Sequence, residues 1–332
     1  MINVAIVGAS GYTGLELIKM LVNHPSFKIN YLATTQGADD ITNLHPSLES
    51  VITQSVEVVD VDTVASSADL VFLAVPHMSA MSLVKQLMKK DIKIVDFSAD
   101  YRLSKVAYEG AYCPHTDVQN LPNAVYGLIE LYREEIKSAK LVAGTGCYPT
   151  ASLLGLAPFI KLFKSTVFID AKSGVSGAGK KLSETTHFIN VNENMFAYAP
   201  LEHRHGVEIS EKASLLGSKV DVLFVPHLVP VTRGMLASIY STIDETIDAV
   251  KLLEEYYKDE PFIRIRNNPV QMKEVSGTHF CDIYLKQQGS TLYIETAIDN
   301  LLRGASSQAL AAANLMCGLD EAEGLPRIAY VP

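Results

Sequence analysis

A glycine-rich turn near the start of the chain places the strongest constraint on its fold. Residues 2–7 form an apolar run typical of a buried strand, and Gly8, Gly11 and Gly14 follow it. Apolar residues at helical spacing come next, and residues 28–33 read as a second strand. This order predicts the first unit of a Rossmann-type domain, in which the glycines let the backbone approach a dinucleotide pyrophosphate. The alternative is a glycine-rich loop of an unrelated α/β protein.

The end of the second strand bears on the choice of cofactor. NAD-binding domains usually carry an Asp or Glu there, which binds the ribose hydroxyls. This chain has Thr34 and Thr35 instead, with no acid before Asp39. Hydroxyl groups can donate hydrogen bonds to a 2′-phosphate, which a carboxylate would repel. The sequence therefore predicts NADP rather than NAD, although no arginine lies nearby to pair with the phosphate.

A cysteine lies where a strand is expected to turn into a helix. Residues 140–143 read as a strand, residues 144–150 follow with the sequence GTGCYPT, and residues 151–163 read as a helix. The N–H groups of a helix start favour an anion, so a thiol there ionises more easily and becomes a better nucleophile. Cys147 is therefore a candidate nucleophile. The alternative is a small buried residue, as cysteines without a disulfide usually are.

Two further places carry groups that could bind an anion. Arg102 follows the strand predicted over residues 92–97, and a guanidinium matches a phosphate in two-pronged geometry. The alternative is a surface arginine paired with Asp100. The segment 172–181, which contains Ser176, offers backbone N–H groups, hydroxyls and lysines to an anion. Its alternative is a flexible surface loop.

The segment His203-Arg204-His205 concentrates groups that transfer protons near neutral pH. A histidine close to a thiol is what such a transfer requires. A metal site is not expected, because no third ligand occurs at helical spacing and no HExxH motif is present. Arg233, in the break between two predicted strands, could bind a carboxylate.

Composition and charge argue against several classes of protein. The net charge of −9 disfavours a nucleic-acid partner, which would need a basic face. No apolar run approaches the roughly 18 residues needed to cross a membrane, so no membrane partner is expected. A strand that starts at Ile2 leaves no room for a secretion signal. The four cysteines are not spaced as in CxxC pairs or metal sites. These features favour a cytoplasmic protein with reduced thiols.

A chain of 332 residues is long enough for two domains. Strands and helices alternate up to Cys147, with strands predicted over 55–61 and 69–75 and a helix over 124–140. Later strands favour a mostly antiparallel sheet, and the alanine-rich segment 305–317 reads as a helix that returns to the first domain. We predict an α/β fold with a Rossmann-type parallel-sheet NADP-binding domain (1–147 and 300–332) and an α+β catalytic and oligomerisation domain (148–299).

Motifs along the whole chain resemble those of the N-acetyl-gamma-glutamyl-phosphate reductase family. They are Gly8–Gly14, Asp96–Arg102, Gly146–Thr150, Asp170–Gly179, His203–His205, Pro226–Pro230 and Arg233–Gly234. The family is similar in architecture to aspartate-semialdehyde dehydrogenase. The resemblance implies NADPH-dependent reduction of an acyl phosphate to an aldehyde through a cysteine thioester, in arginine biosynthesis, by a homo-oligomer (dimer or tetramer). One departure is Gly144-Thr145, where the family commonly has Asn-Pro, which concerns the shape of that turn.

The same resemblance implies roles for individual residues. It places the nucleophile on Cys147 and the acid–base group on His203 or His205, with His205 favoured. It implies that Asn300 approaches the nicotinamide and that Arg102 binds phosphate. Together with the residues above, the candidate cofactor contacts are Gly8, Ser10, Gly11, Tyr12, Thr13, Gly14, Thr34, Ser176 and Asn300. The candidate substrate or phosphate contacts are Arg102, Arg204 and Arg233.

Three alternative functions stay open. An aspartate-semialdehyde dehydrogenase, or a lysine-pathway reductase of a carrier-bound aminoadipyl phosphate, would share this chemistry. An acidic carrier protein calls for a basic rim, which a net charge of −9 does not favour. A cysteine acyl hydrolase or transferase without a redox cofactor would not need the Gly8–Gly14 turn. A nucleotide-sensing Rossmann protein without activity would not need Cys147 and a histidine cluster.

Overall fold

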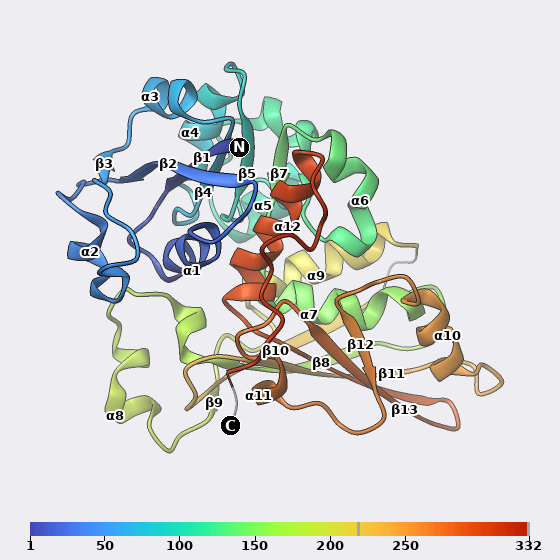
Figure 1. Cartoon of the computed structure of the whole chain (residues 1–332). Coiled ribbons are helices and arrows are strands. Elements are labelled where there is room, and N and C mark those ends of the chain that lie inside the picture. The colour runs from blue at the N-terminus through green and yellow to red at the C-terminus, as the bar shows by residue number, and fades with distance from the viewer. Residues whose placement is uncertain (218–219, 331–332) are drawn as a thin grey trace. The chain divides into compact units, whose positions relative to one another are not determined.

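The structure is a computed structural model that describes residues 1–217 and 220–330, and it contains two compact units (Figure 1). Unit 1 comprises residues 1–145 and 305–326. Unit 2 comprises residues 146–304 and the described residues 327–330. The chain therefore leaves unit 1 directly before Cys147 and returns to it after Gly304.

This division differs from the predicted boundaries at three short stretches, because residues 146–147, 300–304 and 327–330 all lie in unit 2. Near the C-terminus the reason is a backbone contact. The Tyr330 N–H donates to the Ser276 carbonyl at 2.9 Å. This hydrogen bond holds the end of the described chain on unit 2.

Unit 1 is built on a parallel sheet of seven strands in the order β3-β2-β1-β4-β5-β7-β6. The strands are β1 (Ile2–Val7), β2 (Phe27–Thr34), β3 (Glu57–Val58), β4 (Leu70–Leu73), β5 (Lys93–Asp96), β6 (Ala124–Tyr126) and β7 (Leu141–Ala143). Every residue of β4 is buried, as expected for a strand covered on both faces. The strand order reverses between β1 and β4, and such a switch point is where parallel sheets bind ligands. The predicted Rossmann-type α/β fold is confirmed.

Seven α-helices surround this sheet. They are α1 (Tyr12–Leu21), α2 (Ile41–Leu44), α3 (Val61–Ser67), α4 (Ala80–Leu87), α5 (Lys105–Ala111), α6 (Ile129–Ser138) and α12 (Ser307–Met316). Helices α3 and α4 contact each other, whereas α12 contacts α1, α6 and β5. Every residue of α12 is buried, because its alanines allow close packing on all sides. Gln308 Nε2 donates to the Gly127 carbonyl at 2.7 Å and fixes the helix to the loop before α6.

Two elements of unit 1 differ from the sequence prediction. In the stretch 55–61 only β3 is a strand, because Asp60 caps α3: its carboxylate accepts from the Thr63 N–H at 2.8 Å. In the stretch 124–140 the chain first adds β6 to the sheet edge, and α6 begins only at Ile129.

Unit 2 is built on a mixed sheet of seven strands in the order β12-β13-β14-β11-β8-β10-β9. The strands are β8 (Val167–Gly174), β9 (Phe196–Ala197), β10 (Val222–Val229), β11 (Met235–Thr242), β12 (Ile263–Arg266), β13 (Cys281–Gln288) and β14 (Thr291–Ile298). The pairs β8–β10 and β12–β13 are parallel, and the other pairs are antiparallel. The prediction of a mostly antiparallel second sheet is confirmed.

Helix α7 (Cys147–Leu156) packs on this sheet against β11 and β14. Gly155 lets the helix backbone approach the side chains of the sheet closely, since a Cβ there would lie only 2.9 Å from Ile239 Cδ1. Thr296 Oγ1 donates to the Ala151 carbonyl at 3.0 Å, and every residue of α7 after Cys147 is buried. The helix begins at Cys147, earlier than the predicted residue 151. The other helices of this unit are α8 (Phe188–Val191), α9 (Arg204–Leu215), α10 (Ala249–Tyr256) and α11 (Met272–Val275).

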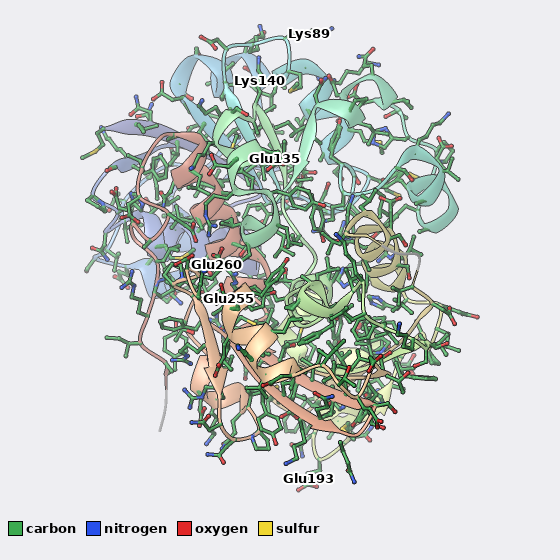
Figure 2. All side chains as sticks on the ribbon, turned by 90° about the vertical axis from the view of Figure 1, so that its right-hand side faces the viewer. Lys89, Glu135, Lys140, Glu193, Glu255 and Glu260 are labelled. Carbon is green, nitrogen blue, oxygen red and sulfur yellow. The ribbon has the colours of Figure 1, made fainter. Side chains whose placement is uncertain are left out.

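The surface of each unit carries many charged side chains. Lys89 of unit 1 and Glu193 of unit 2 are exposed and project from the ribbon (Figure 2).

Two aromatic side chains of the unit 2 sheet, Phe168 and Tyr240, lie opposite each other on β8 and β11 and are also exposed. Over residues 1–217 and 220–330, no helix combines the length and the apolar character needed to cross a membrane.

A buried carboxylate organises the loop that follows β4. Asp100 has no exposed surface, and it accepts hydrogen bonds from the Met78 N–H (2.8 Å), the Ala80 N–H (3.1 Å) and the Tyr108 hydroxyl (2.8 Å). The Met78 backbone has a φ of 70°, a left-handed conformation that costs a non-glycine residue about 1 kcal/mol. Asp100 therefore holds a strained loop at the carboxyl edge of the sheet, where α/β domains bind ligands.

Replacement of Asp100 by alanine should destabilise unit 1 strongly. Two backbone N–H groups and one hydroxyl lose their buried acceptor, so the free energy of unfolding should fall by about 3 kcal/mol or more. Urea unfolding followed by circular dichroism measures this loss. Asp60→Ala is the control, because it removes an exposed helix cap and should cost clearly less. Equal losses in the two variants would contradict the role of burial.

Candidate active site

Cys147 is the first residue of α7, directly after the cap residue Gly146. The Gly146 backbone is extended, with φ −69° and ψ 150°, and its carbonyl accepts from both the N–H and the hydroxyl of Thr150 at 2.9 Å. Cys147 is half-buried, unlike the rest of its helix. The first N–H groups of a helix have no carbonyl partner within the helix, so this position favours a thiolate.

A carboxylate that the sequence analysis missed joins this helix start to α9. Glu208 is buried, and its Oε1 accepts from the Gly146 N–H at 3.0 Å. Glu208 lies three residues after His205, on the same face of α9. That spacing is the signal in the sequence that could have pointed to Glu208. Helix α9 thus brings a carboxylate and a histidine to the α7 side of unit 2.

The two candidate histidines lie at the start of α9 and pack against the neighbour of Cys147. His203 is the cap residue of α9, and its Nδ1 accepts from the His205 N–H at 3.1 Å. The Tyr148 ring meets each histidine ring edge-on, with centroid distances of 5.8 Å to both. The structure therefore brings the helix that begins at Cys147 and both candidate histidines together within unit 2.

Two tyrosine hydroxyls extend this cluster. Tyr198 donates to the Tyr148 hydroxyl at 3.0 Å, and Tyr148 donates to the His227 carbonyl at 3.2 Å. Burial raises the pKa of Tyr198 to about 12 and raises that of Tyr148 further, so both hydroxyls keep their protons at neutral pH. Two neutral hydroxyl groups therefore lie beside the candidate histidines.

The electrostatic state of His203 follows from its surroundings. Burial, with the positive charge of Arg204 as a second cause, lowers the pKa of His203 to about 4. At neutral pH the ring is therefore uncharged. Because Nδ1 accepts a hydrogen bond, the proton of the neutral ring is assigned to Nε2.

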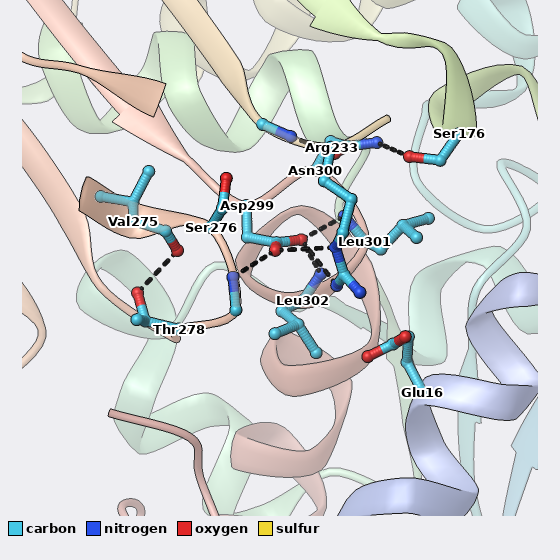
Figure 3. A network of polar contacts seen from close by, with 12 residues as sticks. Glu16, Ser176, Arg233, Val275, Ser276, Thr278, Asp299, Asn300, Leu301 and Leu302 are labelled. Atoms are coloured by element: carbon cyan, nitrogen blue, oxygen red, sulfur yellow. Dashed lines mark hydrogen bonds and ion pairs between the residues drawn. The ribbon is translucent and has the colours of Figure 1, made fainter. Parts of the chain in front are cut away.

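A second cluster in unit 2 joins three of the other predicted residues. Asn300 Nδ2 donates to Ser176 Oγ at 2.9 Å, and Asn300 Oδ1 accepts from the Gly234 N–H at 2.8 Å (Figure 3). The Ser176 N–H donates to the Thr232 carbonyl at 3.1 Å, and residues 175–178 form a turn of 3₁₀-helix. Ser176 thus lies on a hydrogen-bonded turn. This part of the segment 172–181 differs from the flexible surface loop that was the alternative.

Arg233 does bind a carboxylate, and this carboxylate belongs to the chain itself. Its Nε lies 3.0 Å from Asp299 Oδ2 and its Nη2 lies 3.1 Å from Asp299 Oδ1 (Figure 3). Asp299 is fully buried, and sequence reasoning missed it. Arg204, the third arginine of the expected set, is exposed at the first position of α9.

Arg102 lies in unit 1 and is buried, which contradicts the alternative of a surface arginine. Its Nε donates to the Gly144 carbonyl at 2.6 Å, and its Nη2 donates to the Phe97 carbonyl at 2.7 Å. Arg102 therefore fixes the turn of residues 144–145, at which the chain departs from the family pattern.

In the glycine turn of unit 1 the backbone passes close to neighbouring segments. Gly8 has a φ of 97°, and a Cβ on it would overlap the Ala74 carbonyl oxygen. A Cβ on Gly14 would lie 2.6 Å from the Gly8 carbonyl oxygen. Gly11 caps α1, so the N–H groups of Tyr12 and Thr13 lie at the positive end of that helix, with Ser10 in the turn before it.

Thr34 ends β2 at the same edge of the sheet. Its Oγ1 accepts from the Gly37 N–H at 2.9 Å, and an accepting hydroxyl can still donate its own hydrogen.

Among the described residues, no group of three or more His, Cys, Asp and Glu side chains could hold a metal ion.

Two family descriptions match the chain. Residues 3–139 match "Semialdehyde dehydrogenase, NAD binding domain", and residues 147–300 match "Semialdehyde dehydrogenase, dimerisation domain". Unit 1 therefore carries a nicotinamide-dinucleotide-binding domain, and the second match is a domain named for association between subunits.

Solved structures with the same fold include two aspartate semialdehyde dehydrogenases. The enzyme II from Vibrio cholerae has a TM-score of 0.73 at 14% identity, covering 96% of this chain and 99% of that chain. The enzyme from Candida albicans, solved with NADP, has a TM-score of 0.72 at 13% identity, covering 96% of this chain and 99% of that chain. At this level of identity the likeness concerns the fold alone.

Relatives of much higher identity carry another name, N-acetyl-gamma-glutamyl-phosphate reductase. One from Sulfurovum sp. is 59% identical and covers 100% of both chains. One from Wolinella succinogenes is 57% identical over 100% of this chain and 99% of its own, and one from Methanococcus maripaludis is 41% identical over 98% of each. The chain is therefore a semialdehyde dehydrogenase family member that belongs with the N-acetyl-gamma-glutamyl-phosphate reductases.

Proposed function

We propose that this enzyme reduces N-acetyl-L-glutamyl 5-phosphate to N-acetyl-L-glutamate 5-semialdehyde and phosphate, with NADPH, in arginine biosynthesis. The observation that carries the proposal is the place of Cys147 at the start of α7, next to a tyrosine that contacts two histidines. The names of relatives that match over the full length supply the substrate. None of the four cysteines, all of which lie in the described part of the chain, forms a disulfide, which fits the cytoplasm as its compartment.

The first step is attack of the Cys147 sulfur on the acyl carbonyl carbon. The carbon–sulfur bond forms, the bond to the phosphate oxygen breaks, and a thioester remains on Cys147. N–H groups of the α7 start would stabilise the oxyanion, and such donors commonly lower a barrier by about 3 kcal/mol. Arg102, Arg204 and Arg233 are the candidate groups for the phosphate and carboxylate charges of the substrate.

The second step reduces the thioester. NADPH, when bound, supplies the hydride. His205 accepts the thiol proton during the attack and donates it to the oxyanion left on the Cys147 adduct after reduction. The carbon–sulfur bond then breaks, the proton returns to sulfur, and the aldehyde leaves. The phosphate released in the first step takes its proton from solvent.

We assign the proton transfer to His205 rather than His203. His203 uses Nδ1 to accept from the His205 N–H as the cap of α9. Its pKa of about 4 also lies far from neutral pH, whereas a general acid–base group works best with a pKa near the working pH. His203 therefore positions the start of α9, and His205 is the remaining ring next to Tyr148.

We propose NADP as the cofactor, held at Gly8, Ser10, Gly11, Tyr12, Thr13 and Gly14, with Thr34 at the 2′-phosphate and Ser176 and Asn300 toward the nicotinamide. The positive φ of Gly8, the helix start at Tyr12 and the hydroxyl of Thr34 support this assignment. We also propose a homo-oligomer, a dimer or tetramer, that uses the outer face of the unit 2 sheet, where Phe168 and Tyr240 are exposed.

One assay tests the function. The protein is mixed with N-acetylglutamate semialdehyde, phosphate and NADP, and the absorbance of the reduced nicotinamide is followed. We expect a signal that depends on phosphate, a weaker signal with NAD, and none with aspartate semialdehyde. A signal without phosphate would contradict acyl-phosphate chemistry. A stronger signal with aspartate semialdehyde would assign the chain to that sibling activity instead.

Replacement of Cys147 by serine should abolish the reaction, because a hydroxyl at this place is a far weaker nucleophile than a thiolate. Binding of NADPH, measured by fluorescence titration, should stay intact. Cys113→Ser is the matched control, since Cys113 is also half-buried but has no role in the proposed chemistry. Retained turnover in the Cys147 variant would refute the covalent mechanism.

The two histidines should respond differently to replacement by asparagine. His205→Asn should lower kcat by roughly 10²–10⁴-fold, because the proton transfer is lost. His203→Asn should keep kcat within about tenfold, because asparagine is itself a good helix cap. Steady-state kinetics of both variants decide the assignment, and a larger loss in the His203 variant would reverse it.

The His203 variant also has a signature in stability. Because burial holds the pKa of His203 at about 4, below its ordinary value of 6.5, only the unfolded chain takes up this proton as the pH falls between them. The stabilising contribution is therefore present above pH 6.5 and is lost as the pH falls toward 4. Urea midpoints of the parent should drop more steeply over this window than those of His203→Asn. Parallel curves would contradict the lowered pKa.

A further inference from the structure

The carboxylate of Asp299 gathers an unusual number of donors. It is fully buried and accepts from Arg233 Nε (3.0 Å) and Nη2 (3.1 Å), as described above. It also accepts from the Gly277 N–H at 2.7 Å and from the N–H groups of Leu301 and Leu302 at 2.9 Å each (Figure 3). Five N–H groups from three segments of unit 2 thus converge on two oxygens.

The backbone that follows Asp299 has a particular form. Residues 302–306 make a turn of π-helix, and the Gly304 N–H donates to the Asp299 carbonyl at 2.9 Å, five residues back. Such π turns are rare and often occur at functional sites. The side chain of Asp299 caps this turn through Leu301 and Leu302, while its carbonyl closes it through Gly304.

Gly304, in this turn, lies in contact with the candidate nucleophile Cys147. A Cβ on Gly304 would lie 2.6 Å from the Cys147 Cβ and 3.1 Å from the Cys147 Cα. Backbone and thiol-bearing residue are therefore in direct contact, and a methyl group at Gly304 would have to displace Cys147. The place of the Gly304 backbone limits where the Cys147 side chain can lie.

We propose that Asp299 is a positioning residue for Cys147, which it holds in place through the turn 299–304 and the contact at Gly304. The inference rests on the proposed function, in which Cys147 is the nucleophile. Arg233 is then the partner that orients the Asp299 carboxylate through its two hydrogen bonds. A displacement of about 1 Å at a reacting atom can cost about 10²-fold in rate, which sets the size of the expected effect.

The unit contains a matched control for a merely structural role. Asp282 is also fully buried, and Arg264 binds it through Nε (2.5 Å) and Nη2 (3.0 Å) in the same two-pronged manner. Asp282 lies on β13 and Arg264 on β12, so this pair joins two strands and includes no residue of the turn 299–304. Loss of either carboxylate takes the two-pronged partner from a half-buried arginine, so both replacements should lower stability.

The experiment compares Asp299→Asn with Asp282→Asn. In Asp299→Asn we expect kcat to fall about 100-fold with substrate KM within about threefold. Alkylation of Cys147 by iodoacetamide, followed by peptide mass spectrometry across pH 5–9, should show an altered rate and pH profile. Asp282→Asn should keep kcat and the alkylation profile within about twofold of the parent, at a similar loss of urea stability.

Two outcomes overturn the proposal. One is a folded Asp299→Asn protein with parental kcat and alkylation, and the other is an equal loss of kcat in Asp282→Asn. If Asp299→Asn does not fold, Gly304→Ala decides, since it should lower kcat and alter alkylation, whereas Gly110→Ala, into open space, should not. If the parent protein lacks phosphate-dependent reduction, the proposed function fails, but the alkylation comparison still tests the position of Cys147.

Discussion

The hydrogen bond from the Gly146 N–H to the Glu208 carboxylate is the contact on which the arrangement of unit 2 depends. A buried carboxylate is costly unless its oxygens are satisfied, so this bond fixes the start of α7 relative to α9. Helix α7 also packs closely on the sheet at Gly155, and the start of α9 carries the two histidines. Cys147 and the two candidate histidines therefore lie at the starts of two helices that this hydrogen bond joins.

Much of the fold could be predicted because its signals are local. The turn at Gly8, the buried strands of unit 1 and the alternation of the second sheet all follow from residues close in sequence. The errors have local causes too: an Asp60 cap starts a helix where apolar residues suggested a strand, and β6 is a short edge strand before α6. Short elements at a sheet edge carry too few residues to show a period.

The candidate site was less predictable, because its key carboxylates act on residues far away in the sequence. Glu208 and Asp299 each bind backbone N–H groups, and no sequence motif records which N–H a carboxylate will reach. The partner of Arg233 was equally hard to predict, because it lies far away in the sequence. The sequence context of Arg233 suggested a carboxylate partner, and in the structure the Asp299 carboxylate of the chain itself is bound to it. In the sequence, the contact between Gly304 and Cys147 is marked only by the glycine itself.

The return of α12 to unit 1 has a consequence for how the protein is made. Residues 305–326 belong to unit 1, and every residue of α12 is buried there against α1, α6 and β5. A nascent chain that has emerged only through β7 lacks this helix and leaves the apolar surfaces of those three elements in water. At ordinary synthesis rates the ribosome needs roughly ten to forty seconds to supply it. Unit 1 is thus completed only after unit 2 up to Gly304 and then α12 have been synthesised. Until then its uncovered apolar surface is available to chaperones.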